Sequence, residues 1–290
     1  MRWPDWSPKM PEVAFVNGEF MALEKAVIPI EDRGFQFADG VYEVIATYKG
    51  EPYALGEHLD RLERSLRELH IKMNIRDYGL EGLIAEGICR SGFSESLVYI
   101  QITRGVAPRH HEFPGPEIKP TVVMTIKELH RLPSSRYDEG VRVISKPDLR
   151  WKRCDIKSVS LLANILAKQQ AIEAGAFEAF LFDEQGRITE GSSTSAFCIR
   201  AGTLWATPSG PHILPSITRG ILLDLARKIK LPVREEFCNL EDYLAADEVL
   251  LAGTSAEAIG VVQIDDVVIG EGVPGPNTVR LRNAFLHTVE

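Results

Sequence analysis

The sequence lacks long apolar runs and an excess of positive charge. None of its apolar runs approaches the roughly 18–20 residues that a membrane-spanning helix needs. The first residues also lack the apolar core of a secretory signal. The formal net charge is −8 over 290 residues, which argues against a broad nucleic-acid-binding surface. We therefore expect a protein that binds neither membranes nor nucleic acids.

Cysteine is scarce, and its four copies are far apart in the chain, at Cys89, Cys154, Cys198 and Cys238. No two of them have the spacing of a zinc-binding or redox motif. The adjacent His110 and His111 have no acidic partner at helical spacing, so they indicate no metal either. We expect reduced thiols, a cytoplasmic location and no metal site.

Glycine-rich nucleotide-binding loops are also missing, since neither the dinucleotide nor the phosphate-loop pattern occurs. What is present is a series of short apolar strands and amphipathic helices, without a repeated strand–helix–strand unit. Examples are the strand predicted over 41–48 and the helix predicted over 57–70, whose leucines lie at 59, 62, 66 and 69. This order predicts an α/β (α+β) fold with mixed or antiparallel sheets.

A linker is predicted over residues 131–136, which contain proline and serine. This linker divides the chain into two domains. The smaller N-terminal α/β domain comprises residues 1–131. The larger C-terminal α/β domain, residues 132–290, begins with a predicted strand over 141–145 and carries a lysine of interest, Lys157.

Lys157 and Glu190 suggest a particular chemistry. Lys157 precedes an apolar helix predicted over 159–174, and Glu190 begins a turn rich in serine and threonine. A lysine can bind an aldehyde cofactor as a Schiff base, and a carboxylate can keep the cofactor's ring nitrogen protonated. Considered alone, each residue also has an ordinary interpretation, as a solvated surface lysine and as a turn carboxylate.

Several longer segments resemble the fold-type IV pyridoxal-phosphate aminotransferases, and within them most closely the D-amino-acid aminotransferases. The similarity runs in order from about residue 13 to about residue 285. The matching segments are residues 31–44 (EDRGFQFADGVYEV), 101–114 (QITRGVAPRHHEFP), 150–162 (RWKRCDIKSVSLL), 190–197 (EGSSTSAF), 217–219 (ITR) and 253–255 (GTS). The resemblance implies the two-domain fold of that family.

The resemblance also implies pyridoxal 5′-phosphate as the cofactor. Lys157 would be the catalytic lysine that holds the cofactor and moves the substrate's alpha proton, and Glu190 would face the ring nitrogen. The other cofactor-binding residues implied are Arg61, Ser193, Leu214, Ile217, Thr218 and Thr254, with Ser192 nearby and Glu178 behind the cofactor. Without the resemblance, Arg61 would be a solvated helix arginine paired with Glu57, and Thr218 a helix cap.

Four residues would bind the substrate: Tyr42, Arg109, His111 and Ser255. In D-amino-acid aminotransferases, the first three positions form a clamp for the substrate carboxylate, and Arg109 and His111 would come from the neighbouring subunit of a homodimer. A cation with two hydrogen-bond donors suits a carboxylate. The alternative interpretations are an exposed polar loop for Arg109 and His111 and half-buried packing for Tyr42.

The implied reaction is ping-pong transamination between a D-amino acid, of the D-alanine or D-glutamate type, and 2-oxoglutarate or pyruvate. Two departures leave alternatives open: Ser195 stands where the family turn usually has asparagine, and the turn after Gly253 is more similar to that of branched-chain L-amino-acid aminotransferases. The alternatives are a branched-chain L-amino-acid or (R)-amine transaminase on the same fold, a lyase such as 4-amino-4-deoxychorismate lyase, and a cofactor-binding protein without catalysis.

Overall fold

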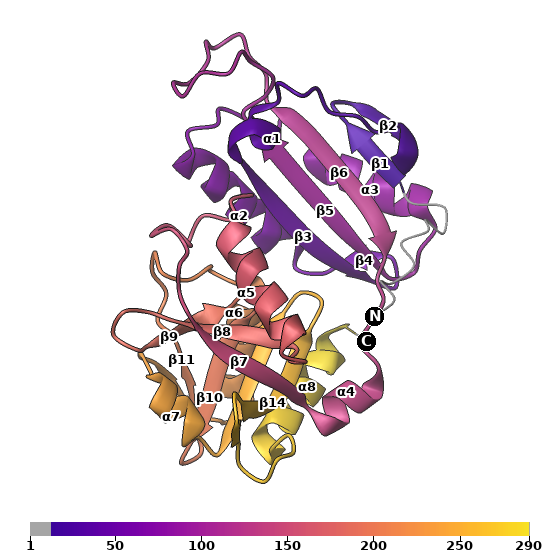
Figure 1. Ribbon diagram of the computed structural model, residues 1–290. Helices are drawn as coiled ribbons and strands as arrows, with labels where there is room; N and C mark the ends of the chain where they lie inside the picture. The colour runs from indigo at the N-terminus through magenta and orange to yellow at the C-terminus, as the bar shows by residue number, and fades with distance from the viewer. Residues whose placement is uncertain (1–12, 290) are drawn as a thin grey trace. The chain divides into compact units, whose positions relative to one another are not determined.

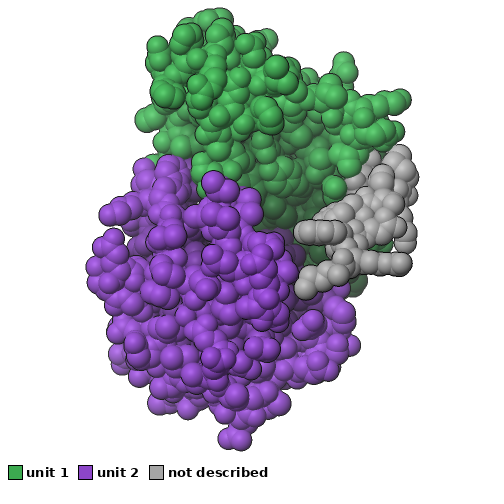
Figure 2. All heavy atoms as spheres, in the orientation of Figure 1, with its two compact units in different colours: residues 1–130, 157–160 green, residues 131–156, 161–290 purple. Residues whose placement is uncertain are grey.

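The computed structural model describes residues 13–289 (Figure 1). The N-terminal residues in which we found no signal-peptide core lie outside this range. The chain divides into two compact units, which are coloured separately in Figure 2: unit 1 comprises residues 1–130 and 157–160, and unit 2 comprises residues 131–156 and 161–290. Within residues 13–289, no helix combines the length and the apolarity of a membrane span.

Unit 1 is built on a six-stranded antiparallel sheet in the order β2-β1-β6-β5-β3-β4. Helices α2 (Leu55–Glu68) and α3 (Leu80–Ser91) pack against it, and η1 (Leu23–Lys25) and α1 (Arg33–Phe37) are short. The strands are β1 (Val13–Val16), β2 (Glu19–Ala22), β3 (Gly40–Tyr48), β4 (Glu51–Pro52), β5 (Ser96–Thr103) and β6 (Thr121–Glu128).

Local sequence signals account for much of unit 1. Asn17 and Gly18 both have positive φ and join β1 to β2, as expected of this pair in a tight hairpin. The leucine stripe of α2 is buried at Leu62 and Leu66, which face the sheet.

Unit 2 contains a nine-stranded mixed sheet in the order β12-β11-β10-β13-β14-β7-β8-β9, with β15 paired to β14. The pairs β11–β12, β14–β7 and β7–β8 are parallel, and the others are antiparallel. The strands are β7 (Val141–Pro147), β8 (Glu178–Phe182), β9 (Ile188–Gly191), β10 (Ser195–Arg200), β11 (Thr203–Ala206), β12 (Val233–Glu235), β13 (Glu248–Gly253), β14 (Glu257–Ile264) and β15 (Val267–Val268).

Three longer helices cover this sheet: α5 (Leu162–Glu173) contacts β7 and β8, whereas α6 (Ile217–Lys228) and α8 (Pro276–Val289) contact β13. Helices α4 (Ser134–Glu139) and α7 (Leu240–Leu244) are short. A core cluster around Phe180, Tyr243 and Leu251 is fully buried. The antiparallel sheet of unit 1 and the mixed sheet of unit 2 confirm the predicted fold class.

Three expectations need correction. The linker predicted over 131–136 is only partly irregular, because α4 begins at Ser134. Lys157, expected in the C-terminal domain, belongs to unit 1, because its segment pairs with β3: Tyr42 N donates to Lys157 O (3.0 Å) and Val159 N donates to Gly40 O (3.1 Å). For the same reason the helix predicted from residue 159 begins only at Leu162.

Candidate active site

The predicted catalytic lysine lies beside a predicted substrate-binding residue in unit 1. Lys157 Nζ is 4.1 Å from the centre of the Tyr42 ring, within the range of a cation–π contact. Its backbone is fixed by β3 and by Ser65, whose Oγ accepts a hydrogen bond from Lys157 N (3.3 Å). The lysine is half-buried. The structure therefore brings Lys157 and Tyr42 together at β3.

A buried ionic cluster lies next to this pair on β3. Glu43 is 0% exposed and accepts hydrogen bonds from Arg61 Nε (2.6 Å) and Nη2 (2.8 Å), and it pairs with His58 Nδ1 (2.7 Å). Burial alone would raise the pKa of Glu43, but the hydrogen bonds from Arg61 and His58, together with the nearby charge of Lys157, lower it to about 2. Glu43 is therefore an anion, and it holds the guanidinium of Arg61 in a fork.

This cluster changes the interpretation of Arg61. With 8% of its surface exposed, Arg61 is not the solvated helix arginine of the ordinary interpretation. Glu43 was not among the site residues predicted from the sequence. The available signal was a carboxylate in the middle of an otherwise apolar strand, since a charged residue is almost never fully buried unless it is paired.

The loop that carries Arg109 and His111 is held against α1. Arg33 donates to the carbonyl oxygens of His110 (2.6 Å) and His111 (3.4 Å), and the ring centre of Phe37 lies 4.8 Å from the guanidinium carbon of Arg109. The side chains of Arg109 and His111 are nonetheless exposed.

Asp39 fixes the base of this loop. Its carboxylate accepts hydrogen bonds from Arg33 (2.8 Å) and from Arg104 (2.7 and 2.9 Å). Burial acts to raise the pKa of Asp39, but the two guanidinium groups outweigh it and lower the pKa. Arg104 also stacks on Phe113 of the loop, 3.7 Å from the ring centre.

In unit 2, the predicted acid lies at the end of β9. Glu190 is 6% exposed, and both of its oxygens accept a hydrogen bond from Leu214 N (3.1 and 3.2 Å). Arg150 Nη1 contacts Glu190 Oε1 directly. Burial raises the pKa of Glu190, while Arg150 and the Leu214 amide oppose the shift. Glu190 and Leu214 are thus brought together, with Arg150 as a neighbour to which the sequence had given no role.

Glu178 organises the turn that follows Glu190. It is 0% exposed and accepts hydrogen bonds from Ser193 Oγ (2.7 Å) and N (3.2 Å), and Ser192 Oγ also contacts it. Gly191 is required here, because a Cβ atom at this position would overlap Thr194 Oγ1. Glu178, at the start of β8, is therefore joined by hydrogen bonds to Ser192 and Ser193 of the turn. All three are residues that the sequence predicted for the site.

Ser195, at the departure from the family turn, is buried, and its hydroxyl has no hydrogen-bond partner among the described residues.

Helix α6 begins at two predicted phosphate-binding residues. Ser216 caps the helix by accepting a hydrogen bond from Arg219 N (3.2 Å), and Ile217 and Thr218 form its first turn. Amides in a first helical turn have no acceptor within the helix and suit an anion. Thr254 and Ser255 lie in the turn between β13 and β14, Thr254 half-buried and Ser255 exposed.

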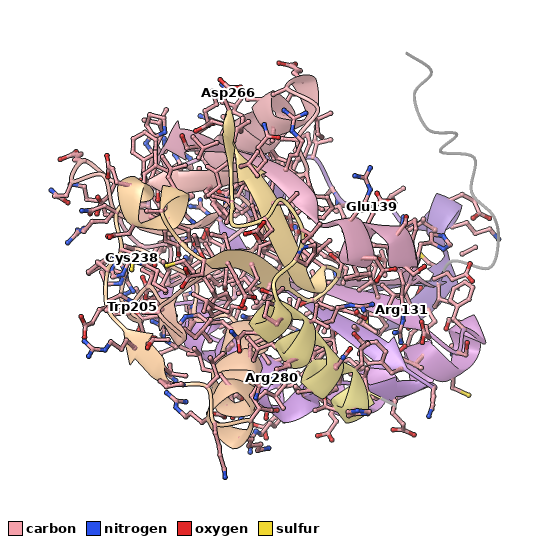
Figure 3. All side chains as sticks on the ribbon, turned by 90° about the horizontal axis from the view of Figure 1, so that it is seen from below. Arg131, Glu139, Trp205, Cys238, Asp266 and Arg280 are labelled. Atoms are coloured by element: carbon pink, nitrogen blue, oxygen red, sulfur yellow. The ribbon has the colours of Figure 1, made fainter. Side chains whose placement is uncertain are left out.

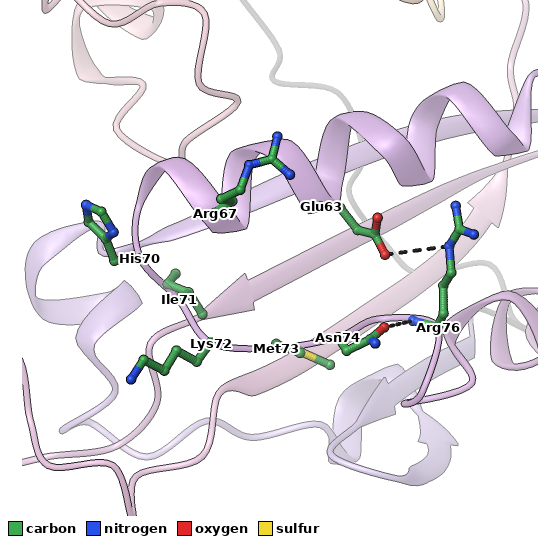
Figure 4. Close-up of a pocket in the computed structure, with 8 residues that line it drawn as sticks. All are labelled: Glu63, Arg67, His70, Ile71, Lys72, Met73, Asn74 and Arg76. Atoms are coloured by element: carbon green, nitrogen blue, oxygen red, sulfur yellow. Dashed lines mark hydrogen bonds and ion pairs between the residues drawn. The ribbon is translucent and has the colours of Figure 1, made fainter.

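Two surface pockets, one on each unit, contain none of the predicted site residues. One on unit 1 has a volume of about 640 Å³, and Figure 4 shows its cations Arg67 and Lys72 directed away from each other, while Arg76 contacts Glu63 (3.7 Å). Another on unit 2, of about 430 Å³, borders Trp205, which is labelled in Figure 3. Among residues 13–289, no group of histidine, cysteine and acidic side chains could hold a metal ion.

Comparison with known proteins identifies the family. The model of the family Amino-transferase class IV matches residues 40–264. A D-alanine aminotransferase of Staphylococcus haemolyticus is 37% identical over 277 residues, covering 95% of this chain and 97% of the relative, and one of Bacillus licheniformis is 37% identical over 273 residues, covering 94% and 95%.

Among solved structures, a branched-chain amino acid aminotransferase of T.th. with pyridoxamine 5′-phosphate superposes with a TM-score of 0.87 at 28% identity, covering 96% of this chain and 93% of that one. The family model spans well over half of the chain, and the segments that it matches carry Lys157, Glu190 and Tyr42. The chain therefore belongs to the class IV aminotransferases, of fold type IV.

Proposed function

We propose that this aminotransferase transfers the amino group of a D-amino acid, such as D-alanine or D-glutamate, to 2-oxoglutarate or pyruvate in a ping-pong cycle, with pyridoxal 5′-phosphate as its cofactor. The observation that carries the proposal is the contact of Lys157 Nζ with the Tyr42 ring in a chain similar over its length to D-alanine aminotransferases. These two residues are the predicted catalytic lysine and one member of the predicted carboxylate clamp.

Unit 1 has side chains that suit the aldehyde and the phosphate of pyridoxal 5′-phosphate. Lys157 Nζ would bond covalently to the cofactor's aldehyde carbon and, once released, take the proton from the substrate's alpha carbon. Arg61 would bind the phosphate: Glu43 occupies its Nε and Nη2 donors and so fixes the orientation of the guanidinium. A cation of fixed orientation loses little rotamer freedom on binding a dianion.

Unit 2 has side chains and amides that suit the ring nitrogen and the phosphate of pyridoxal 5′-phosphate. The buried carboxylate of Glu190 suits the ring nitrogen, while the first-turn amides of Ile217 and Thr218, with Thr254, suit phosphate oxygens. Ser193 and Leu214 would border the ring, with Glu178 behind it, and Ser255 would contact the substrate. The bound cofactor supplies the electron sink for the carbanion, and the protein supplies orientation and charge.

A homodimer would complete the clamp. Arg109 and His111 are exposed on a loop whose backbone is held by Arg33 through the carbonyl oxygen of His110, a geometry suited to presenting them to another subunit. Helix α5 also exposes apolar side chains, namely Leu162 (71%), Ile165 (60%), Leu166 (56%) and Ile172 (57%). Contiguous exposed apolar surface is typical of an interface, and we propose that a second copy covers it. The free thiols of the four cysteines fit a cytoplasmic location.

A second candidate function is a branched-chain L-amino-acid aminotransferase. It is favoured by the likeness to the solved branched-chain aminotransferase and by the turn after Gly253. This alternative uses the same lysine and acid, and differs in the residues that select the substrate.

A panel of amino donors separates these functions. The purified enzyme, loaded with pyridoxal 5′-phosphate, is offered D-alanine, D-glutamate, L-leucine or (R)-1-phenylethylamine together with 2-oxoglutarate or pyruvate, and the product 2-oxo acid or ketone is quantified. We expect turnover of the D-amino acids well above that of L-leucine. Turnover of L-leucine or the (R)-amine alone would replace the proposal by that alternative, and pyruvate release from aminodeoxychorismate without an acceptor would indicate a lyase.

A further inference from the structure

Arg150 lies between two carboxylates of unit 2. Its guanidinium donates to Asp148 Oδ1 through Nε (2.9 Å) and to Asp148 Oδ2 through Nη2 (2.7 Å), and Nη1 contacts Glu190 Oε1. Nη2 also donates to the carbonyl oxygen of His212 (3.2 Å). Only 7% of the side chain is exposed, so these contacts are shielded from water.

Arg150 itself is rigidly held. Both carboxylate oxygens of Asp148 accept hydrogen bonds from the Arg150 guanidinium. Asp148 is in turn fixed by Thr189, whose hydroxyl donates to Asp148 Oδ2 (2.8 Å). Burial acts to raise the pKa of Asp148, but Arg150 outweighs it and lowers the pKa, so Asp148 stays ionised beside Arg150. A guanidinium held on one edge by a carboxylate presents its other edge in a defined direction, and that edge contacts Glu190.

The charged form of Glu190 is stabilised by the guanidinium of Arg150. Burial disfavours its charged form, and of the main groups around it only Arg150 and the Leu214 amide favour the charged form, whereas Asp148 opposes it. Cys154, which also faces this cluster, has its pKa raised to about 11 by burial and contributes no charge at neutral pH. Arg150 is therefore the charged group that favours the ionised form of Glu190, and the Leu214 amide assists it.

We propose that Arg150 is a positioning residue that keeps Glu190 ionised, so that the proton shared by Glu190 and the cofactor's ring nitrogen resides on the nitrogen. Asp148 and Thr189 hold Arg150 for this purpose. The inference rests on the proposed function, because it takes the ring nitrogen as the partner of Glu190. Its physical basis is that a positive charge beside a carboxylate lowers the proton affinity of that carboxylate and leaves the nitrogen as the better base.

The test uses the holoenzyme and its Arg150→Met and Arg150→Lys variants. Arg153→Met is the matched control, because Arg153 lies in the same segment, pairs with Asp155 (3.0 Å) and is 43% exposed. Each protein is loaded with cofactor labelled with ¹⁵N at the ring nitrogen, whose chemical shift reports its protonation in solid-state NMR. Cofactor dissociation is measured separately by equilibrium dialysis.

We expect the ¹⁵N shift of the wild type and of Arg153→Met to be that of a protonated ring nitrogen. In Arg150→Met it should move toward the unprotonated value, with cofactor binding weakened about tenfold or more, the scale of a lost charge-assisted hydrogen bond. Arg150→Lys should lie between them, since it keeps the charge and loses the fork.

An Arg150→Met holoenzyme whose ring nitrogen stays fully protonated would overturn the proposal. If this variant does not fold, Arg150→Gln, which also removes the charge, takes its place: a wild-type shift overturns the proposal, and a shift toward the unprotonated value supports it. Failure of the proposed function has a different signature, because the wild type itself would then neither retain the labelled cofactor nor transaminate.

Discussion

The Glu43→Gln substitution keeps the size of a fully buried side chain and removes its negative charge. Glu43 is 0% exposed and is held by Arg61 and His58, and its pKa falls from 4.5 to about 2. A shift of this size corresponds to about 3 kcal/mol of folding free energy at neutral pH. The glutamine would also leave the buried guanidinium of Arg61 without its counter-charge, which acts in the same direction.

The sign of the pH dependence follows from the lowered pKa. The ionised Glu43 contributes its full stability above the unfolded-state value near 4.5, and the contribution is lost as the pH falls through the folded-state value of about 2. We therefore expect Glu43→Gln to be about 3 kcal/mol less stable than the wild type at pH 7, and the difference to shrink steadily below about pH 4.5.

The assay is urea unfolding of the cofactor-free protein, followed by circular dichroism at pH 7, 4 and 3. Glu57→Gln is the control, because Glu57 is an exposed residue in the first turn of the same helix as Arg61, and we expect it to change stability by less than about 0.5 kcal/mol. A Glu43→Gln effect that is as large at pH 3 as at pH 7, or no larger than that of Glu57→Gln, would refute the electrostatic account of this cluster.

Three further predictions concern the proposed catalytic lysine, the proposed clamp and the turn after Glu190. Lys157→Ala should abolish the visible absorbance of covalently bound cofactor and nearly all turnover, whereas Lys152→Ala, an exposed lysine of the same segment, should retain both; a coloured and active Lys157→Ala enzyme would rule out the assignment. Arg109→Ala should raise KM for D-alanine and spare a donor without a carboxylate, measured by steady-state kinetics against the exposed Arg67→Ala; equal losses on both donors would argue against a clamp. Gly191→Ala should destabilise the protein by about 1–3 kcal/mol in urea unfolding, because its methyl group overlaps Thr194, whereas Gly56→Ala in the open first turn of α2 should be neutral or stabilising; a neutral Gly191→Ala would show that the turn can relax.

Several features are determined by neighbouring residues in the sequence. The hairpin at Asn17–Gly18 follows from a pair that tolerates positive φ, and the start of α6 from the capping hydroxyl of Ser216. The end of α5 follows from Gly175, which has a positive φ just after the helix. The family follows from segments that carry Lys157 and Glu190.

Other features could not be predicted, because they depend on residues far apart in the sequence. The helix after Lys157 begins three residues later than expected, since a stretch that is locally suited to helix pairs with β3. Glu43 acquires its role from Arg61, 18 residues away, and Arg150 acquires its role from Glu190, 40 residues away.

The sequence by itself determined the chemical groups of this protein: an amine, an acid, a guanidinium-bearing loop and the segments that identify an aminotransferase of class IV. Only the tertiary structure decided which charges are neighbours, that Glu43 anchors Arg61 and that Arg150 contacts Glu190. The physical reason is that the type of a side chain fixes which charge it can carry. Its pKa and orientation depend instead on burial and on partners that folding brings together from distant parts of the chain.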